Sequence, residues 1–407
     1  MSRKRQSRFL YRITKIAAWF YAKTVFKRKM RRNEIKGKKG PFVIIANHQA
    51  ALDFVNLIGA SQRLMTFVVS DSFYNTLPVK GIMTKIKVIP KQQFQTTVTD
   101  LKKMKTAIEQ GKILVIYPAG LMCEDGVSTP IPDATYKFLK WLGTDVYMAR
   151  TQGTYFVSPK WSKIKRRGRT YLDIYKLFDK DELKTLSEGE VKERASEALL
   201  FDAYREQEEL KVKYKNGSNI EGLENVLYIC PHCKGEFTTR TQGNRIFCTV
   251  CGYEQSSDEY GFLHNEKGIG EEIRYVSDWS RWIYEAERER VKNGEIEMLK
   301  CDTVVEMIDY DKRKFLPVSE ATLTLDKDKF TLKDKNESDE EVTVCVPIAT
   351  FASLPFKPGK YIEIQKGPDI YRLLLENGKE AMRYVNVVKA FYELNSRLAK
   401  PRLRQEQ

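Results

Sequence analysis

A histidine followed five residues later by an aspartate is the first pattern in this sequence that could do chemistry. His48 and Asp53 follow the apolar run 42–46, which is long enough for a buried strand and too short for an independent helix. If the chain then turns into a helix, predicted at 52–63, the carboxylate can reach back to one imidazole nitrogen. The other nitrogen would face outward as a base for a hydroxyl group. A core histidine beside a helix-capping aspartate is the alternative interpretation.

The elements that must position this pair come from an alternation of apolar runs and helical patterns between residues 42 and 178. We predict strands at 42–46, 65–69, 87–90, 113–117, 146–150 and 170–176, and helices at 52–63, 77–86, 95–110 and 133–142. Such alternation predicts an α/β domain with helices around a mostly parallel sheet. Sites in such sheets form at the carboxyl ends of strands. We therefore expect His48 to converge with Tyr117-Pro118-Ala119-Gly120, which comes at the end of another apolar run.

The first of these segments resembles a motif of the glycerolipid acyltransferase family, of which lysophosphatidic acid acyltransferase is the best-known member. Asn47, His48 and Asp53 match the family motif Asn-His-x-x-x-x-Asp in full. Residues 81–91 lie where the family carries a Gly-x-Ile-Phe-Ile segment that ends in a basic residue, and Lys91 takes that position. The resemblance covers about residues 5–200.

A further family motif, Phe-Pro-Glu-Gly-Thr-Arg, is matched only in part. Three residues fit it: Tyr117, Pro118 and Gly120. Ala119 replaces the glutamate, and Leu121-Met122 replaces Thr-Arg. The family associates that glutamate and arginine with the phosphorylated glycerol acceptor, and neither function is available to Ala119, Leu121 or Met122. The departure indicates a different acceptor, a phosphate held elsewhere, or lost activity. Because His48 and Asp53 are present, we favour an active enzyme.

The resemblance implies an O-acyltransferase similar to 1-acylglycerol-3-phosphate acyltransferase. The donor would be an acyl thioester, acyl-CoA or acyl carrier protein, and the acceptor a hydroxyl of a lysophospholipid or related glycerolipid. His48 would act as general base and Asp53 would orient it. The expected substrate-binding residues are Asn47, Lys91, Tyr117, Pro118 and Gly120. The competing hypothesis is a membrane-associated lipid-binding or scaffold protein with a non-catalytic acyltransferase fold.

Positive charge is concentrated at the start of the chain. Residues 1–40 carry fifteen Lys or Arg and one acid, Glu34, while the whole chain has a net charge of +16. We predict one helix at 7–32, with Phe9, Ile13, Ile16, Ala17 and Phe20 at helical spacing. A basic amphipathic segment at 1–40 indicates an anionic membrane surface. The alternative is a helix packed on its own domain with a solvated basic face.

The sequence has no apolar stretch of eighteen residues and no signal-peptide layout, so we expect no spanning helix. These features predict a cytoplasmic protein, peripheral on the inner face of the membrane. The acyltransferase domain should cover 41–215.

Two Cys-x-x-Cys pairs predict a metal site. The four cysteines are Cys230, Cys233, Cys248 and Cys251. Four thiolates at this spacing can close a tetrahedral structural zinc site, so we predict a zinc ribbon at 225–262 in which His232 is not a ligand. A redox-active pair would leave the second pair unexplained. The ribbon carries no basic stripe, so we do not expect nucleic-acid binding.

The last part of the chain has the pattern of an antiparallel β domain. A helix is predicted at 278–293, a polar acidic loop at 335–341 and a closing helix at 380–398. Between the helices we predict strands at 302–308, 321–325, 328–333, 342–347, 361–365 and 370–375. Residues 270–400 therefore look like a pleckstrin-homology-like, barrel-like domain closed by a helix, an analogy that supplies no ligand.

Overall fold

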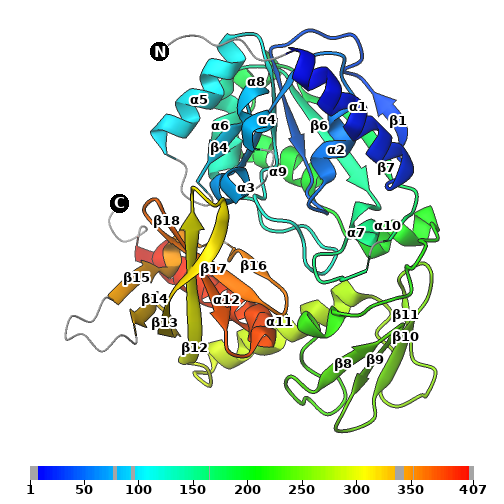
Figure 1. Ribbon diagram of the computed structural model, residues 1–407, viewed down its shortest axis with the longest axis vertical. Helices are drawn as coiled ribbons and strands as arrows, with labels where there is room; N and C mark the ends of the chain where they lie inside the picture. The colour runs from blue at the N-terminus through cyan, green and yellow to red at the C-terminus, as the bar shows by residue number, and fades with distance from the viewer. Residues whose placement is uncertain are drawn as a thin grey trace. The chain divides into compact units, whose positions relative to one another are not determined.

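The computed structural model describes residues 8–76, 80–92, 97–164, 166–334, 343–351 and 353–402, which form two compact units (Figure 1). Unit 1 runs to Gly217 without Trp161–Ile164 and includes Glu259–Gly261. Unit 2 holds Trp161–Ile164 and the remaining described residues. The acidic loop predicted at 335–341 lies outside the described residues. So do the predicted helical positions 77–79 and 95–96 and the predicted strand position 342.

Unit 1 is built on a seven-stranded sheet in the order β1-β7-β6-β2-β5-β3-β4. The strands are β1 (Lys29–Asn33), β2 (Phe42–Ala46), β3 (Met65–Ser70), β4 (Ile89–Lys91), β5 (Ile113–Ile116), β6 (Val146–Gln152) and β7 (Tyr171–Phe178). From β6 to β4 all neighbours pair parallel, whereas β7 runs antiparallel to β6 and parallel to β1. This sheet confirms the predicted α/β class.

Helices cover the sheet on one face with a shared apolar core. The core helices are α5 (Val98–Glu109), α6 (Ala134–Leu142) and α9 (Glu188–Leu199), which contribute Met104, Leu139 and Val191 beside Val43 and Leu114 of the sheet. The other helices of unit 1 are α1 (Arg8–Thr24), α2 (Asp53–Ile58), α3 (Asp71–Thr76), α4 (Lys80–Lys85), α7 (Thr154–Val157), α8 (Glu182–Thr185) and α10 (Ala203–Leu210). α1 and α2 pack together and lie side by side in Figure 1.

The helix predicted at 7–32 is too long. α1 ends at Thr24, Lys27 adopts a positive φ of 42°, and Lys29–Asn33 forms β1 instead. β1 pairs parallel with β7, so its backbone groups are satisfied by ladder hydrogen bonds rather than by helical ones. The partner strand lies far along the chain, and helical spacing of apolar residues cannot reveal such a pairing.

α1 has two different apolar faces. Tyr11, Ala18 and Ala22 are buried against unit 1, where the Tyr11 hydroxyl accepts a hydrogen bond from the Met65 backbone N–H at 3.1 Å. Lys15 Nζ donates to the Ser61 carbonyl at 2.7 Å. The remainder of the helix leaves six large side chains exposed: Phe9, Ile13, Ile16, Trp19, Phe20 and Tyr21. The helix is therefore anchored to its domain through a narrow face while a broad apolar face remains open.

Unit 2 contains two antiparallel sheets. The smaller has the order β11-β10-β9-β8, with β8 (Thr239–Gln242), β9 (Arg245–Cys248), β10 (Glu254–Ser257) and β11 (Leu263–His264). The larger has seven strands in the order β15-β14-β13-β12-β18-β17-β16. They are β12 (Met298–Asp309), β13 (Lys314–Asp326), β14 (Lys329–Asp334), β15 (Thr343–Pro347), β16 (Phe356–Lys357), β17 (Tyr361–Lys366) and β18 (Asp369–Leu375).

Two helices complete unit 2, α11 (Val276–Lys292) and α12 (Ala381–Arg402). They contact each other, and α12 also packs against β16 and β17. An antiparallel sheet closed by a final helix confirms the fold class predicted for this part of the chain. The likeness to a pleckstrin-homology domain stays a prediction.

A buried ionic cluster joins the small sheet region to these helices. Glu287 of α11 is fully buried and accepts a hydrogen bond from the Tyr228 hydroxyl at 2.9 Å. Arg290 and Arg383 contact both Glu287 and Glu236, so two guanidinium groups balance two carboxylates. Burial raises the pKa of Glu287, and the charge of Arg383 opposes that rise. The segments predicted as a separate ribbon and β domain thus share one interior.

Candidate functional site

The predicted catalytic segments meet at one edge of the unit 1 sheet. His48 follows β2, Tyr117 follows β5, and these parallel neighbours are in register, with Ile45 opposite Ile116. The carboxyl ends of both strands therefore lie at the same edge. The ring centroids of His48 and Tyr117 are 4.6 Å apart, with the planes tilted by 40°.

His48 and Asp53 form a direct pair. His48 Nδ1 lies 3.2 Å from Asp53 Oδ2, and Asp53 is fully buried at the first residue of α2. The same oxygen accepts the backbone N–H groups of Gln49 at 2.7 Å and Ala50 at 2.9 Å. Because an ionised carboxylate can only accept, this pairing favours the tautomer with its proton on Nδ1 and a lone pair on Nε2. The His48 side chain is 19% exposed, which gives a small molecule access to the ring.

Asn47, predicted to bind substrate, is occupied by the protein itself. Its side-chain amide donates to the Thr151 carbonyl and accepts from the Thr151 N–H, both at 2.8 Å. Asn47 is only 3% exposed. Both ends of the amide thus fasten the residue before His48 to β6.

Tyr117 carries an unused hydroxyl beside His48. The oxygen is buried and has no hydrogen-bond partner in the described part of the chain, and the same holds for Asp53 Oδ1. Burial raises the pKa of Tyr117 well above its usual value, and the charge of Asp53 adds to the rise. Tyr117 is therefore a neutral hydrogen-bond donor. The family motif has phenylalanine at this position, which carries no hydroxyl. That difference was the only feature of the sequence that pointed to the Tyr117 hydroxyl.

The turn after Tyr117 is fixed by its own backbone. Gly120 has a φ of +69°, which favours glycine, and its N–H donates to the Tyr117 carbonyl at 3.0 Å. That N–H is already engaged in the turn, so it is a poor candidate for stabilising an oxyanion. Pro118 and Ala119 lie between these residues and are half-buried.

Cys123 fastens the following loop, a contact that sequence reasoning missed. Its N–H donates to the His48 carbonyl at 3.4 Å, and its Sγ lies 3.6 Å from the Gln49 carbonyl. The side chain is fully buried, and burial raises the pKa of its thiol well above the ordinary value. Cys123 is therefore an unreactive structural thiol under the His48 turn.

Gln49 also supports the His48 turn, and the sequence analysis did not single it out. It is fully buried, and its Oε1 accepts hydrogen bonds from Thr154 Oγ1 at 3.1 Å and from the Tyr155 N–H at 3.3 Å. Nothing in the sequence distinguishes Gln49 from its neighbours in the motif, because its partners arrive from α7.

Lys91 lies at the carboxyl end of β4, in register with Ser70 at the end of β3. Its Nζ donates to the adjacent Gln92 carbonyl at 3.0 Å, and burial lowers its pKa. Within the described residues, no hydrogen bond or ion pair joins Lys91 to His48 or Tyr117. Lys91 thus shares an edge of the sheet with the predicted catalytic pair without touching it.

The four cysteines of unit 2 are gathered into one cluster. The Sγ atoms of Cys230, Cys233, Cys248 and Cys251 all lie within 4.8 Å of one another. Two of the separations, Cys230 to Cys251 and Cys233 to Cys248, are 3.7 Å. A tetrahedral ion with bonds of about 2.3 Å to sulfur separates its ligands by about 3.8 Å. The donor set therefore fits a single metal ion, and His232 stays outside it.

Local backbone geometry builds each half of this cluster. The Cys230 N–H donates to the Gly235 carbonyl, and the Cys248 N–H donates to the Tyr253 carbonyl, closing a tight turn around each pair. Gly252 has a φ of +76°, which only glycine adopts readily. Helix α11 is bonded to the residue just before the cluster, because Trp279 Nε1 donates to the Ile229 carbonyl at 2.9 Å.

Comparison with known proteins gives a family match within unit 1. Residues 26–158 match the model of the Acyltransferase family. The matched residues include His48, Asp53 and Tyr117. No curated protein is matched by the chain.

Among solved structures, the chain is similar to the 1-acyl-sn-glycerophosphate (LPA) acyltransferase PlsC from Thermotoga maritima. The two share 20% sequence identity with a TM-score of 0.41, over 50% of this chain and 79% of that one.

The double hydrogen bond of Asn47 gives a prediction about stability. Asn47→Ala should destabilise the protein by about 2–3 kcal/mol, because it leaves buried backbone groups of Thr151 without their partner. The measurement is urea-induced unfolding of the intact chain. Asn33→Ala is the control, since the Asn33 amide makes a single bond to the Ala60 carbonyl. Equal, small effects of the two substitutions would contradict the anchoring role.

Proposed function

We propose that this protein transfers a fatty acyl chain from an acyl thioester, acyl-CoA or acyl carrier protein, to a hydroxyl of a lysophospholipid or related glycerolipid. One observation carries the proposal: His48 Nδ1 is paired with Asp53 Oδ2 at 3.2 Å in a domain of the acyltransferase family. That pairing leaves Nε2 as the free base at the edge of the sheet.

The proposed reaction uses the pair in sequence. His48 Nε2 takes the proton of the acceptor hydroxyl as its oxygen attacks the thioester carbonyl carbon. The tetrahedral intermediate then collapses, the carbon–sulfur bond breaks, and the thiolate takes the proton back from Nε2. Asp53 stabilises the imidazolium between these steps, and its two backbone hydrogen bonds hold the carboxylate still. No acyl-enzyme forms, so no nucleophilic serine or cysteine is needed.

We propose that Tyr117 contacts the acceptor, and that the acceptor therefore differs from that of the wider family. Ala119 offers no carboxylate, whereas the Tyr117 hydroxyl is buried, neutral and unpartnered beside His48. A buried donor without a partner gains a hydrogen bond when a substrate oxygen arrives. Lys91 at the same edge is the proposed contact for a distal phosphate.

The catalytic proposal predicts a large and specific loss of activity. His48→Ala and Asp53→Asn should each lower acyl transfer by at least about a hundredfold, the usual scale for losing a general base or its support. Turnover of acyl-CoA with a lysophospholipid, followed by lipid mass spectrometry, is the measurement.

The chain offers a matched control for this experiment. His264 Nε2 lies 3.0 Å from Asp258 Oδ2 in unit 2, so His264→Ala also removes a histidine from an aspartate pair. That variant should keep wild-type turnover. Near-normal activity of His48→Ala would instead favour a lipid-binding or scaffold protein.

We also propose that the four-cysteine cluster holds a structural zinc ion. Four thiolates satisfy tetrahedral zinc and leave no open coordination position, so the ion would stabilise the fold and take no part in acyl transfer. The sulfur separations of 3.7 Å support a single ion.

Purified protein should contain about one zinc per chain by elemental analysis, the stoichiometry of one four-thiolate site. Cys233→Ser should lose most of it, whereas Cys345→Ser, a free cysteine on β15, should keep it. Hydrogen exchange in Cys233→Ser should rise in α11 as well as in 225–262, because Trp279 and Glu287 join the cluster region to α11. The proposal would be overturned by a wild-type protein that contains no zinc and shows the same hydrogen exchange as Cys233→Ser.

The exposed face of α1 supports a third proposal, peripheral attachment to the inner face of a membrane. No helix within the described residues is both long and apolar enough to cross a bilayer. Yet Phe9, Ile16 and Phe20 are 72%, 68% and 64% exposed in a segment where cationic side chains are dense. Apolar insertion and attraction to anionic lipids act together in such a helix.

Liposome flotation tests the attachment. The wild type should bind anionic vesicles better than neutral ones, and raised salt should weaken that binding without abolishing it. Replacing Phe9, Ile16 and Phe20 together by serine should weaken binding at high salt at least about tenfold, because apolar burial is lost. The control replaces Leu200 and Val250, two exposed apolar residues elsewhere, by serine. Equal binding by both variants would place the anchor outside α1.

A further inference from the structure

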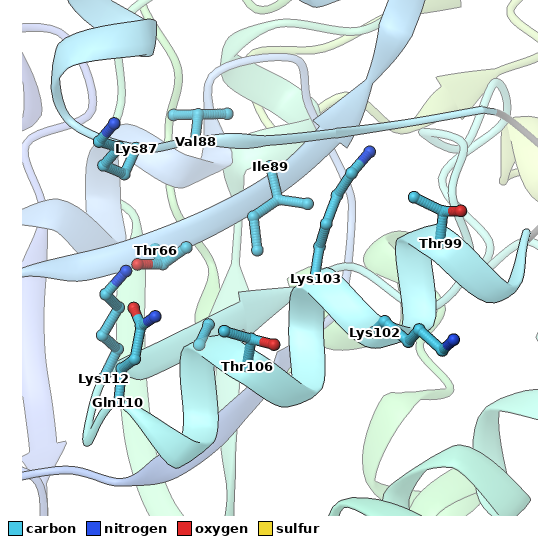
Figure 2. Close-up of a pocket in the computed structure, with 11 residues that line it drawn as sticks. Thr66, Lys87, Val88, Ile89, Thr99, Lys102, Lys103, Thr106, Gln110 and Lys112 are labelled. Carbon is cyan, nitrogen blue, oxygen red and sulfur yellow. The ribbon is translucent and has the colours of Figure 1, made fainter. Parts of the chain in front are cut away.

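A cavity of about 430 Å³ lies beside α5 in unit 1 (Figure 2). Its lining includes Thr66 near the start of β3, Lys87 and Val88 just before β4, and Lys112 just before β5. Parallel strands begin at one edge of a sheet and end at the other. The cavity therefore opens at the edge opposite to the His48 turn, and it is not part of the candidate acyl-transfer site.

The lining is strongly cationic. Among the described residues that line it there is no acidic one, and four are lysines: Lys87, Lys102, Lys103 and Lys112. Asp100 pairs with Lys103 at 3.2 Å from outside the lining. In the part of the chain that the structure describes, no ion pair is formed by Lys87, Lys102 or Lys112. The cavity thus presents positive charge that the surrounding protein leaves uncompensated.

Lys87 and Lys112 oppose each other electrostatically. Burial lowers the pKa of Lys112, and the nearby charge of Lys87 lowers it further. Two ammonium groups that repel each other across a cavity are stabilised by an anion between them. Lys87 also adopts a positive φ of 61°, a conformation that favours glycine, so its position is held against a local backbone cost.

Thr66 adds a second, independent observation. It is 1% exposed, and its hydroxyl has no hydrogen-bond partner in the described residues. In Figure 2, Thr66 and Lys112 lie at the same end of the pocket, and Lys87 lies above them. Leaving a buried hydroxyl unpaired costs stability, and a valine would fill the same space without that cost. The hydroxyl is therefore an unpaired polar group buried in the wall of the pocket.

We propose that this pocket binds a small phosphorylated molecule, with the phosphate held between Lys87, Lys112 and the Thr66 hydroxyl. The volume suits a ligand of metabolite size. Val88, Ile89 and Ala107 line the same pocket and offer apolar contact to the rest of the ligand. The recognised group is a phosphate dianion, which a soluble metabolite and a lipid headgroup can both supply. The proposal does not depend on the acyl-transfer mechanism.

Calorimetric titration with inorganic pyrophosphate tests the site on the full chain. Lys87→Gln and Lys112→Gln should each weaken binding at least about tenfold, the scale of one lost charge-assisted hydrogen bond. Lys180→Gln makes the same charge change at an exposed position of unit 1 outside the pocket and should bind as the wild type does. No binding by the wild type, or equal weakening by all three variants, would overturn the proposal.

Thr66→Val separates binding from folding. Without pyrophosphate this variant should melt at or above the wild-type temperature, because an unpaired buried hydroxyl is removed. With pyrophosphate the wild type should gain thermal stability and Thr66→Val should gain much less. An equal gain in both proteins would show that the hydroxyl does not contact the ligand, and would contradict the proposed site.

Vesicles containing phosphatidic acid distinguish the two sources of phosphate. If Lys87→Gln and Lys112→Gln float less than Lys180→Gln does, the pocket takes a lipid headgroup. If all three float equally while the first two lose pyrophosphate binding, the ligand is a soluble metabolite. His48→Ala should leave pyrophosphate binding unchanged, so failure of the acyl-transfer proposal and failure of this one are distinguishable.

Discussion

One carboxylate oxygen holds the candidate site together. Asp53 Oδ2 pairs with His48 Nδ1 and accepts hydrogen bonds from the backbone N–H groups of Gln49 and Ala50. A single buried atom therefore holds both the turn and the imidazole. Asp53 begins α2, where the amino end of the helix also favours negative charge. Oδ2 thus meets three donors, whereas Oδ1 has no hydrogen-bond partner in the described residues. The catalytic proposal depends on this arrangement.

The surrounding contacts keep the turn in place from three directions. Asn47 ties it to β6, Cys123 ties it to the loop after β5, and Gln49 ties it to α7. Each contact is made by a buried side chain, and none of them uses the outward nitrogen of His48. These hydrogen bonds fix the position of the turn, and none of them involves His48 Nε2, the atom that the proposed mechanism uses as the base.

Local spacing made some of these features predictable. The His48–Asp53 pair lies within one turn of chain, and each Cys-x-x-Cys pair closes its own backbone turn, so residue spacing alone indicated both groupings. The alternation of strands and helices also predicted the sheet that brings Tyr117 to His48. Functional roles for these residues remain proposals that the experiments above test.

Features made by distant segments could not be predicted in the same way. β1 was mistaken for helix because its partner β7 lies far along the sequence. The two hydrogen bonds that join the Asn47 amide to Thr151 also come from a distant segment, β6, and the role expected of Asn47 in binding substrate stays a prediction. The cationic pocket combines residues from β3, the turn before β4, α5 and the position just before β5, and none of these is distinctive in its own segment.

The tautomer of His48 is the most direct test of the account. Long-range nitrogen–proton NMR of the intact protein can resolve its three histidines, with His264→Ala to assist assignment. The account predicts that neutral His48 carries its proton on Nδ1 and an unprotonated Nε2. A neutral His48 protonated on Nε2 would contradict it, because that ring could not accept a proton from an acceptor hydroxyl while paired with Asp53.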